Sequence, residues 1–463
     1  MPRRQLLVPL ALALLAGAPS ALPAASAGRA ASADTLRLHE DVFALASEDC
    51  AGRRAGTPGN ARAREYLLSR LASLGLEPLP GADGLTQPFA VVGVELDSLR
   101  GALGTPAGAQ VPLQLSVASP FRASASPRVV AWPKGEPAPA CGAPTLLIRL
   151  GPAGRGEEFS PSSLELEAEA AGAEGVVLVP DPADSTGLFG HYLARTRSRD
   201  PRLYALAGAP PTGVLAYADG PGAELLYGMA LSTPEGWGLR LPAGRPLALE
   251  GVNLLGRLPG EEPSTRVLLL SAHYDHLGVT PEGLFPGADD NVSGVATLLE
   301  TLELLRGQPH RDELRVLLAD GEELGLLGAR AYLAAEGKPD RVINLDSVGR
   351  AGVDSYRKLR DPSLADARLM IHWSSDAGAP GATRLDAALA ARGFAVQAGD
   401  GPMFARGGDH WVFAEAGVPA DFLFGGFHVD YNTVNDRPER LLLDRLGLLA
   451  EALASYCDES LDR

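Results

Sequence analysis

The sequence predicts a mixed α/β protein, in which a mixed, mostly parallel sheet is flanked by helices and carries an inserted, smaller β-rich α/β domain. In the second half of the chain, apolar runs alternate regularly with amphipathic stretches, as in strands joined by crossover helices. Between residues 89 and 248, Pro and Gly are frequent and the apolar runs are short. We therefore predict one domain from residues 35–88 and 249–463, and an insert at residues 89–248.

The first 27 residues are expected to form a secretory signal peptide outside the fold. Arg3 and Arg4 precede an apolar run too short to span a bilayer, and small residues at positions 25–27 offer a cleavage site. No later segment has ~18 uninterrupted apolar residues. We therefore expect an exported protein, periplasmic or extracellular, with no membrane attachment after cleavage.

Composition limits the remaining possibilities. With 463 residues, of which 46% are hydrophobic, the chain is long enough for two or more domains. The net charge of −16 gives no electrostatic basis for binding nucleic acid. Cys50, Cys141 and Cys457 allow at most one internal disulfide, and their spacing fits no zinc motif. Their pairing stays open.

The part of the chain before the insert is expected to be largely helical from residue 35 to residue 79. Ala63, Leu67, Leu71 and Leu74 recur at spacings of three and four, and Gly75 then ends the pattern. Within the insert, apolar runs at 143–150 and 173–181 predict buried strands with a helix between them.

After residue 253, alternating strands and helices are predicted. The strands are expected at residues 266–276, 313–320, 341–346, 367–373 and 420–426. The helices are expected at residues 291–307, 324–337, 385–393 and 437–456. This order predicts a sheet of crossover units.

Acidic and imidazole side chains recur where these strands end. His273 closes a strand, and Asp275 lies two positions further, on the same side of an extended chain. That spacing suits a metal ligand and a carboxylate that orients it. A purely structural His–Asp hydrogen bond is the alternative.

The segment GADDNVSG, residues 287–294, opens a predicted helix. Helix capping explains one acidic residue there but not two in succession. We predict that Asp290 bridges two metal ions and that Asp289 caps the helix or supports a ligand.

Glu322, Glu323 and Asp346 follow predicted buried strands, where unpaired carboxylates are costly unless a cation or a proton neutralises them. We predict Glu323 as a metal ligand and Glu322 as the general base. The alternative places both glutamates in the solvated first turn of the next helix.

These segments together resemble the motifs of the M28 family of co-catalytic zinc aminopeptidases. The matching stretches, in order, are HYDH (273–276), GADDNVSG (287–294), DGEELGLLGARAYL (320–333), INLDSVG (343–349), GDHWVFAEAGVP (408–419) and DYNTVND (430–436). Upstream, AGRRAGTPG (51–59) is similar to the N-terminal part of family members. The insert resembles a protease-associated (PA) domain in its position and in its pattern of short apolar runs with frequent Pro and Gly.

The resemblance implies a zinc exopeptidase-like fold, two zinc ions and peptide substrates with a free N-terminus. His273 and Asp346 would bind one zinc ion, and Asp290 would bridge it to the second, which Glu323 would also bind. Family members also often have a cis peptide at the position of Asp290–Asn291.

The expected reaction is hydrolysis of a peptide bond by a water molecule that the two zinc ions activate. Glu322 is expected to take a proton from this water and to return it to the leaving amine. Asp275 would support His273. The Tyr431 hydroxyl is expected to help stabilise the oxyanion that develops at the scissile carbonyl.

One departure affects the second metal. The family usually supplies its last ligand from the His of a Tyr-His-Thr motif, but this chain has Tyr431-Asn432-Thr433. An amide oxygen is a poorer zinc ligand than imidazole. We expect His428 to substitute, with ligation by Asn432 or a one-metal site as alternatives.

The other histidines of these motifs are expected to be secondary. His276 would shape the pocket or face water, and His410 would border the site without binding metal. Two other functions stay open: a one-zinc enzyme like glutaminyl cyclase, and a catalytically inactive protein that binds a partner through the insert.

Overall fold

The computed structural model describes residues 32–116, 125–142, 144–151, 161–183, 189–190, 193, 202–207, 214–260, 266–308, 312–350 and 368–458. The predicted signal peptide lies outside these ranges. In them the chain forms two main sheets, each with its own hydrophobic core, and one short hairpin.

The larger sheet has nine strands in the described residues, ordered β17-β16-β18-β15-β11-β14-β10-β1-β7. The strands are β1 (Thr86–Leu96), β7 (Arg202–Leu206), β10 (Gly244–Leu258), β11 (Val267–His273), β14 (Glu313–Ala319), β15 (Arg341–Asp346), β16 (Leu369–Ser374), β17 (Ala395–Ala398) and β18 (Ala420–Phe424). Its centre, β14-β11-β15-β18, is parallel, whereas β10, β1 and β7 add to one side in antiparallel fashion. The predicted mixed α/β class is confirmed.

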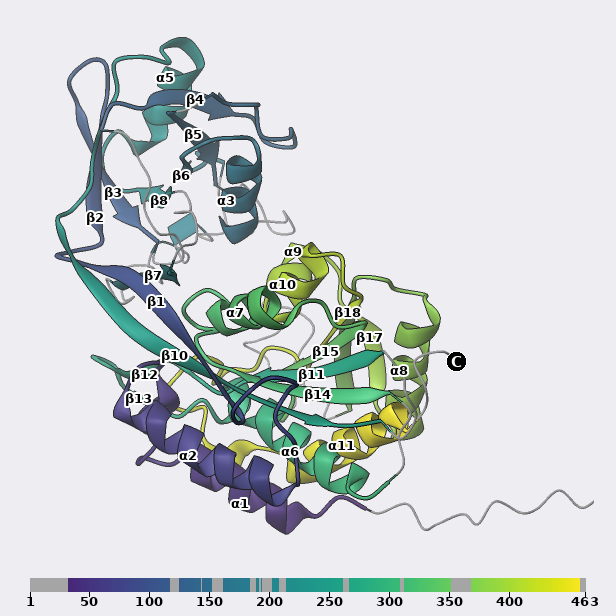
Figure 1. Ribbon diagram of the computed structural model, residues 1–463. Helices are drawn as coiled ribbons and strands as arrows, with labels where there is room; N and C mark the ends of the chain where they lie inside the picture. The colour runs from purple at the N-terminus through teal and green to yellow at the C-terminus, as the bar shows by residue number, and fades with distance from the viewer. Residues whose placement is uncertain are drawn as a thin grey trace, which may run out of the picture. The chain divides into compact units, whose positions relative to one another are not determined.

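Helices cover both faces of this sheet (Figure 1). They are α1 (Thr35–Leu45), α2 (Pro58–Ser73), α6 (Gly294–Leu305), α7 (Leu327–Glu336), α8 (Pro380–Ala391), α9 (Pro402–Arg406), α10 (His410–Glu415) and α11 (Leu443–Cys457), with short 3-10 turns η1 (Ala51–Arg53) and η5 (Pro438–Arg440). A hairpin of β12 (Gly278–Thr280) and β13 (Gly283–Phe285) stands apart from both main sheets.

Strand β11 shows why the central strands have mostly apolar sequences without alternation. Leu268 and Leu270 pack into a core shared with α1, α2, α6, α8 and α11, while Leu269 faces α7 and α10 on the opposite side. A parallel strand that is covered on both faces has no solvated side, so its sequence shows no alternation. Ala63, Leu67 and Leu71 of α2 are buried in the first of these cores, as their spacing predicts.

The insert contains the second sheet, with seven strands in the described residues, ordered β4-β5-β6-β8-β3-β2-β9. Its elements are β2 (Arg100–Gly104), β3 (Gln110–Leu115), β4 (Arg128–Trp132), β5 (Thr145–Leu150), α3 (Pro161–Ala170), β6 (Gly175–Val179), β8 (Val214–Ala218), η2 (Ala223–Leu225), α5 (Leu226–Ser232) and β9 (Gly238–Arg240). Strand β7 lies within the predicted insert range, yet it pairs with β1 of the larger sheet. Strand β1 pairs along its whole length with residues 244–254 of β10, across both predicted insert boundaries.

The structure bears on two expectations from the sequence, one about disulfide bonds and one about membrane-spanning segments. Cys50, Cys141 and Cys457 are all free thiols, and Cys50 and Cys457 are buried. Among the described residues, no helix has both the length and the apolarity required to cross a membrane.

Candidate metal centre

The carboxyl ends of β11, β14 and β15 bring the predicted ligands together. These three strands are parallel neighbours, so their ends meet at one edge of the sheet. His273 is the last residue of β11, and Asp346 is the last residue of β15. Glu322 and Glu323 follow β14 in the next loop. Rigid strand ends of this kind can hold ligands in fixed positions.

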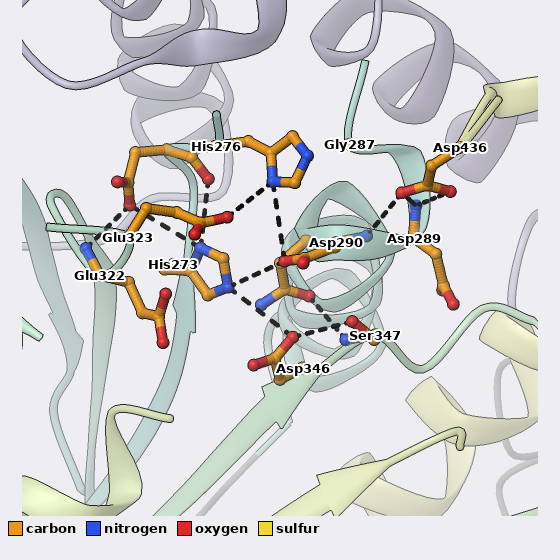
Figure 2. A network of polar contacts seen from close by, with 12 residues as sticks. His273, His276, Gly287, Asp289, Asp290, Glu322, Glu323, Asp346, Ser347 and Asp436 are labelled. Atoms are coloured by element: carbon orange, nitrogen blue, oxygen red, sulfur yellow. Dashed lines mark hydrogen bonds and ion pairs between the residues drawn. The ribbon is translucent and has the colours of Figure 1, made fainter. Parts of the chain in front are cut away.

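One group of possible ligands consists of His273, Asp290 and Asp346, all buried. Their ligand atoms lie within 4.8 Å of one another. His273 Nε2 lies 3.4 Å from Asp290 Oδ1 and 3.7 Å from Asp346 Oδ1 (Figure 2). The three side chains therefore converge on one point.

A second group consists of His276, Asp290 and Glu323, again with ligand atoms within 4.8 Å of one another. His276 Nδ1 lies 2.8 Å from Glu323 Oε1 and 3.9 Å from Asp290 Oδ1. Asp290 belongs to both groups. Its carboxylate has the position that a ligand shared between two cations requires.

The backbone around Asp290 is fixed by buried polar contacts. It lies in the irregular helical turn η3 (Ala288–Ser293), and the Asp290–Asn291 peptide is cis, in line with the family resemblance. The Asn291 amide donates to the carbonyl of Leu345 over 2.8 Å, and its oxygen accepts from the backbone of Ser347 over 3.2 Å. Asp436 accepts the backbone N–H of Asp290 over 3.1 Å. These contacts tie the turn to the end of β15.

Arg53 joins the loop after β11 to this turn. Its guanidinium, which is fully buried, donates to the carbonyls of Tyr274 over 2.8 Å, Pro286 over 2.7 Å and Gly287 over 2.8 Å. A fourth hydrogen bond reaches the carbonyl of Leu45 over 2.9 Å. The planar guanidinium can satisfy several carbonyls at once, which an ammonium group cannot do with the same geometry.

Asp275 connects the first imidazole to the loop that carries the glutamates. His273 Nδ1 lies 3.1 Å from the backbone carbonyl oxygen of Asp275. A carbonyl only accepts, so Nδ1 carries a proton, and Nε2 faces Asp290 and Asp346. The Asp275 carboxylate also lies beside this imidazole, with Oδ1 3.7 Å from Nδ1, and it accepts the backbone N–H of Glu322 over 3.0 Å.

The electrostatics of this site favour a bound cation. Burial raises the pKa of Asp290, although the two imidazoles oppose it. Burial also raises the pKa of Glu322 well above its ordinary value, with neighbouring carboxylates adding to the effect. Burial acts to lower the pKa of His273, but the surrounding carboxylates, Glu322 foremost, outweigh it and hold that pKa well above its ordinary value. Buried carboxylates at this density are costly without a neutralising cation.

The donor set also fits a metal. His273 Nε2 and both ring nitrogens of His276 are buried and have no polar partners among the described residues other than the carboxylates of the two ligand groups. Burial lowers the pKa of His276, which favours the neutral imidazole. Neutral imidazole nitrogens and carboxylate oxygens are the ligands that zinc takes in catalytic sites. The residues present are therefore suited to zinc.

Comparison with known families agrees with this geometry. Residues 253–457 match the family model of peptidase family M28. This region of the chain belongs to peptidase family M28. The resemblance drawn from the sequence motifs is confirmed.

Individual relatives of this M28 chain include metalloproteases and aminopeptidases. A probable zinc metalloprotease of Leptosphaeria maculans is 30% identical over 207 residues, which cover 38% of this chain and 46% of that protein. An aminopeptidase of Bacillus subtilis is 27% identical over 225 residues, which cover 46% of this chain and 45% of that protein. The match thus spans a little under half the length of each of these curated relatives.

Solved structures share the fold over most of the M28 chain. An aminopeptidase from Aneurinibacillus sp. strain AM-1 has a TM-score of 0.58 at 18% identity, covering 92% of this chain and 93% of that one. A zinc aminopeptidase from Bacillus subtilis has a TM-score of 0.51 at 19% identity, covering 93% and 98%.

Three predicted site residues, His428, Tyr431 and Asn432, come from the segment after β18. His428 Nε2 is 3.0 Å from Asp289 Oδ2, and neither residue belongs to a ligand group among the described residues. Tyr431 packs against Phe427, with ring centroids 5.1 Å apart. Asn432 adopts a left-handed backbone conformation (φ 54°), and its side-chain oxygen is buried without a hydrogen-bond partner among the described residues.

His276 was not predicted to lie among the possible metal ligands. It was expected to shape the pocket or face water, but its side chain is buried in the second ligand group. The available signal was a second imidazole three residues after His273, in the same short loop at the end of β11.

Asp409 was also missed. Its carboxylate is buried without a hydrogen bond, and burial, with Asp275 and Asp346 contributing, raises its pKa to about 7. The neighbouring His410 borders the site as expected. Its Nε2 lies 2.8 Å from the carbonyl of Phe404, and its ring stacks on Phe422 with centroids 4.2 Å apart.

Proposed function

We propose that this protein is a metal-dependent aminopeptidase that hydrolyses N-terminal residues from peptides, with zinc as the metal. The observation that carries the proposal is the pair of buried ligand groups that share Asp290 at the carboxyl edge of a parallel sheet. Membership in peptidase family M28 supports peptide substrates.

In the proposed site, His273 and Asp346 would hold one zinc ion, Glu323 would hold the second, and Asp290 would contact both. The bound zinc would polarise the scissile carbonyl and lower the pKa of the attacking water. The distances around His273 Nε2 and the shared position of Asp290 support these assignments.

Glu322 acts as the general base in this proposal. Its carboxylate takes a proton from water as the water oxygen attacks the carbonyl carbon, and it returns that proton to the amine nitrogen as the C–N bond breaks. The hydrogen bond between its backbone N–H and the Asp275 carboxylate supports a fixed position for the base.

We propose Tyr431 as the residue that helps stabilise the oxyanion. It is half-buried at the edge of an aromatic cluster that includes Phe424 and Phe427. Its hydroxyl would donate to the developing negative charge.

Two further sequence predictions remain part of the proposal. The charged and apolar pattern of residues 1–27 supports export to the periplasm or the extracellular space. The separate sheet and core of the insert are compatible with a PA domain. N-terminal sequencing of the exported protein tests the cleavage after residue 27.

A peptide assay tests the activity. The purified protein is stripped with a chelator, reloaded with zinc, and given one short peptide with either a free or an acetylated N-terminus. We expect stepwise shortening of the free peptide only, and only after reloading, as followed by mass spectrometry. Glu322→Gln is the matched control.

The same assay separates the alternatives. An N-terminal glutaminyl peptide that loses ammonia without becoming shorter would favour a glutaminyl-cyclase-like enzyme. A zinc-loaded protein that converts none of a broad panel of peptides would favour a binding protein and contradict the proposal.

A further inference from the structure

The second ligand group contains a side chain that no motif assigns to the metal. Asp290 and Glu323 supply two carboxylates there, whereas zinc in catalytic sites generally takes three protein ligands. The tail motif, which was expected to supply an imidazole, carries Asn432 instead. The third ligand must therefore be identified from the geometry.

His276 has the position of that ligand. The residue is 1% exposed, and its Nδ1 lies 2.8 Å from Glu323 Oε1 and 3.9 Å from Asp290 Oδ1. Figure 2 shows its ring beside these two carboxylates, on the opposite side of Asp290 from Asp346. Apart from these two carboxylates, neither ring nitrogen has a polar partner among the described residues, and Nε2 is left as a buried, unsatisfied polar atom. Such atoms are rare unless a ligand satisfies them.

The surrounding backbone is shaped to hold this ring. Gly287 has a φ of +56°, and a Cβ there would overlap both the His276 ring and the carbonyl oxygen of Asp290. Glycine therefore allows the close approach of the imidazole to the turn that carries Asp290. Arg53 fixes both sides of this contact, because it donates to the carbonyls of Tyr274 and Gly287.

The competing imidazole, His428, lies beside a different carboxylate. His428 Nε2 lies 3.0 Å from Asp289 Oδ2, and Asp289 in turn accepts the backbone N–H of Gly349 over 2.6 Å. His428 therefore pairs with a carboxylate that belongs to neither ligand group in the described part of the chain.

We infer that His276 binds the second zinc ion through Nδ1 and takes over the role of the imidazole that is absent at Asn432. The inference rests on the proposed function for the presence of zinc. It means that the loop at the end of β11 supplies one imidazole to each metal: His273 to the first and His276 to the second.

Zinc stoichiometry tests the inference independently of activity. Wild type, His276→Ala, His428→Ala and Asn432→Ala are loaded with zinc, dialysed against a weak chelator and measured by elemental analysis. We expect two zinc ions per chain in the wild type, His428→Ala and Asn432→Ala, and one in His276→Ala. Calorimetric titration of each apoprotein should show a weaker second site only in His276→Ala, by more than the ~10–100-fold typical of losing a residue that merely supports a ligand.

A stability measurement shows whether each variant still folds. The melting temperature of each apoprotein is compared with that of its zinc-loaded form, because ligand binding to the folded state raises it. We expect His276→Ala and His276→Gln to keep a cooperative apo transition and to show a smaller zinc-induced rise than wild type.

The outcomes distinguish the inference from the proposed function. Two zinc ions in His276→Ala, or loss of one in His428→Ala or Asn432→Ala, would overturn the role of His276 and leave the aminopeptidase proposal standing. The role of His276 would also be overturned if the wild type bound one zinc ion and His276→Ala still bound one. A wild type that binds no zinc would overturn the proposed function itself.

Discussion

The carboxylate of Asp275 accepts the backbone N–H of Glu322, with Oδ1 3.0 Å from the nitrogen. The backbone carbonyl of Asp275 lies 3.1 Å from His273 Nδ1. One residue thus orients both an imidazole of the first ligand group and the loop that carries the proposed base, without belonging to either ligand group itself among the described residues.

Removing the Asp275 carboxylate should therefore impair catalysis through position. We expect Asp275→Ala to lower kcat/KM by ~10–100-fold, the range for residues that orient metal ligands. Asp275→Asn keeps an oxygen that can accept the Glu322 N–H, and it should lose less. Steady-state kinetics of both variants check this, and an alanine variant as active as wild type would contradict it.

Glu322→Gln should separate proton transfer from metal binding. An amide cannot take the proton from water, so we expect kcat to fall by ~10²–10⁴-fold, as for loss of a general base. Zinc content should stay at the wild-type level. Glu323→Gln is the matched control at the adjacent position, and it should lower zinc content. Full activity in Glu322→Gln would rule out its role.

Arg53 should be important for stability as well as for the site. Arg53→Lys keeps the charge but cannot donate to all four carbonyls, and each buried carbonyl left unpaired costs about 1–3 kcal/mol. We expect a lower free energy of unfolding in urea for the apoprotein and weaker zinc binding.

The neighbouring residue provides the control for Arg53. Arg54 is half-buried, and we expect Arg54→Lys to change the free energy of unfolding by only about 0.5 kcal/mol. Equal stability of Arg53→Lys and wild type would show that the four hydrogen bonds contribute little.

His372 should give the folded protein a pH dependence away from the metal site. Its Nδ1 lies 2.6 Å from Asp386 Oδ1, and its Nε2 lies 2.9 Å from Asp421 Oδ1. Burial acts to lower the pKa of His372, but the two carboxylates, Asp421 foremost, outweigh it and raise that pKa above its ordinary value of 6.5. Protonated His372 is therefore favoured in the folded state. Its stabilising contribution is complete below pH 6.5 and is lost as the pH rises through the raised value.

Urea unfolding of the apoprotein across this pH window measures the effect. We expect the wild type to lose stability as the pH rises above about 6.5, and His372→Gln to show a flatter profile. His39 is exposed and serves as the control, because His39→Gln should keep the wild-type profile. Parallel profiles for wild type and His372→Gln would contradict the expectation.

The sequence predicted the sheet and much of the ligand set because those signals are local. Strands β11, β14 and β15 are mostly apolar, and acidic or imidazole side chains lie at or directly after the end of each strand. Their parallel order then brings His273 and Asp346 to one edge, as crossover connections predict.

The features that were missed depend on contacts between distant segments. The position of the His276 ring depends on Gly287 and Arg53, which no local pattern around residue 276 reveals. His428 is close to Asn432 in sequence, yet it pairs with Asp289. Similarly, β7 lies within the sequence range of the insert but pairs with β1 of the larger sheet. Strand pairing depends on which strand lies beside it in the fold, and the local sequence does not reveal this.

Anomalous diffraction at the zinc absorption edge, from crystals of the zinc-loaded protein, tests the central claim most directly. We predict two peaks on either side of Asp290, separated by ~3.5–4 Å, one against His273 and Asp346 and the other against Glu323. The absence of any anomalous peak within bonding distance of the Asp290 carboxylate would contradict the account.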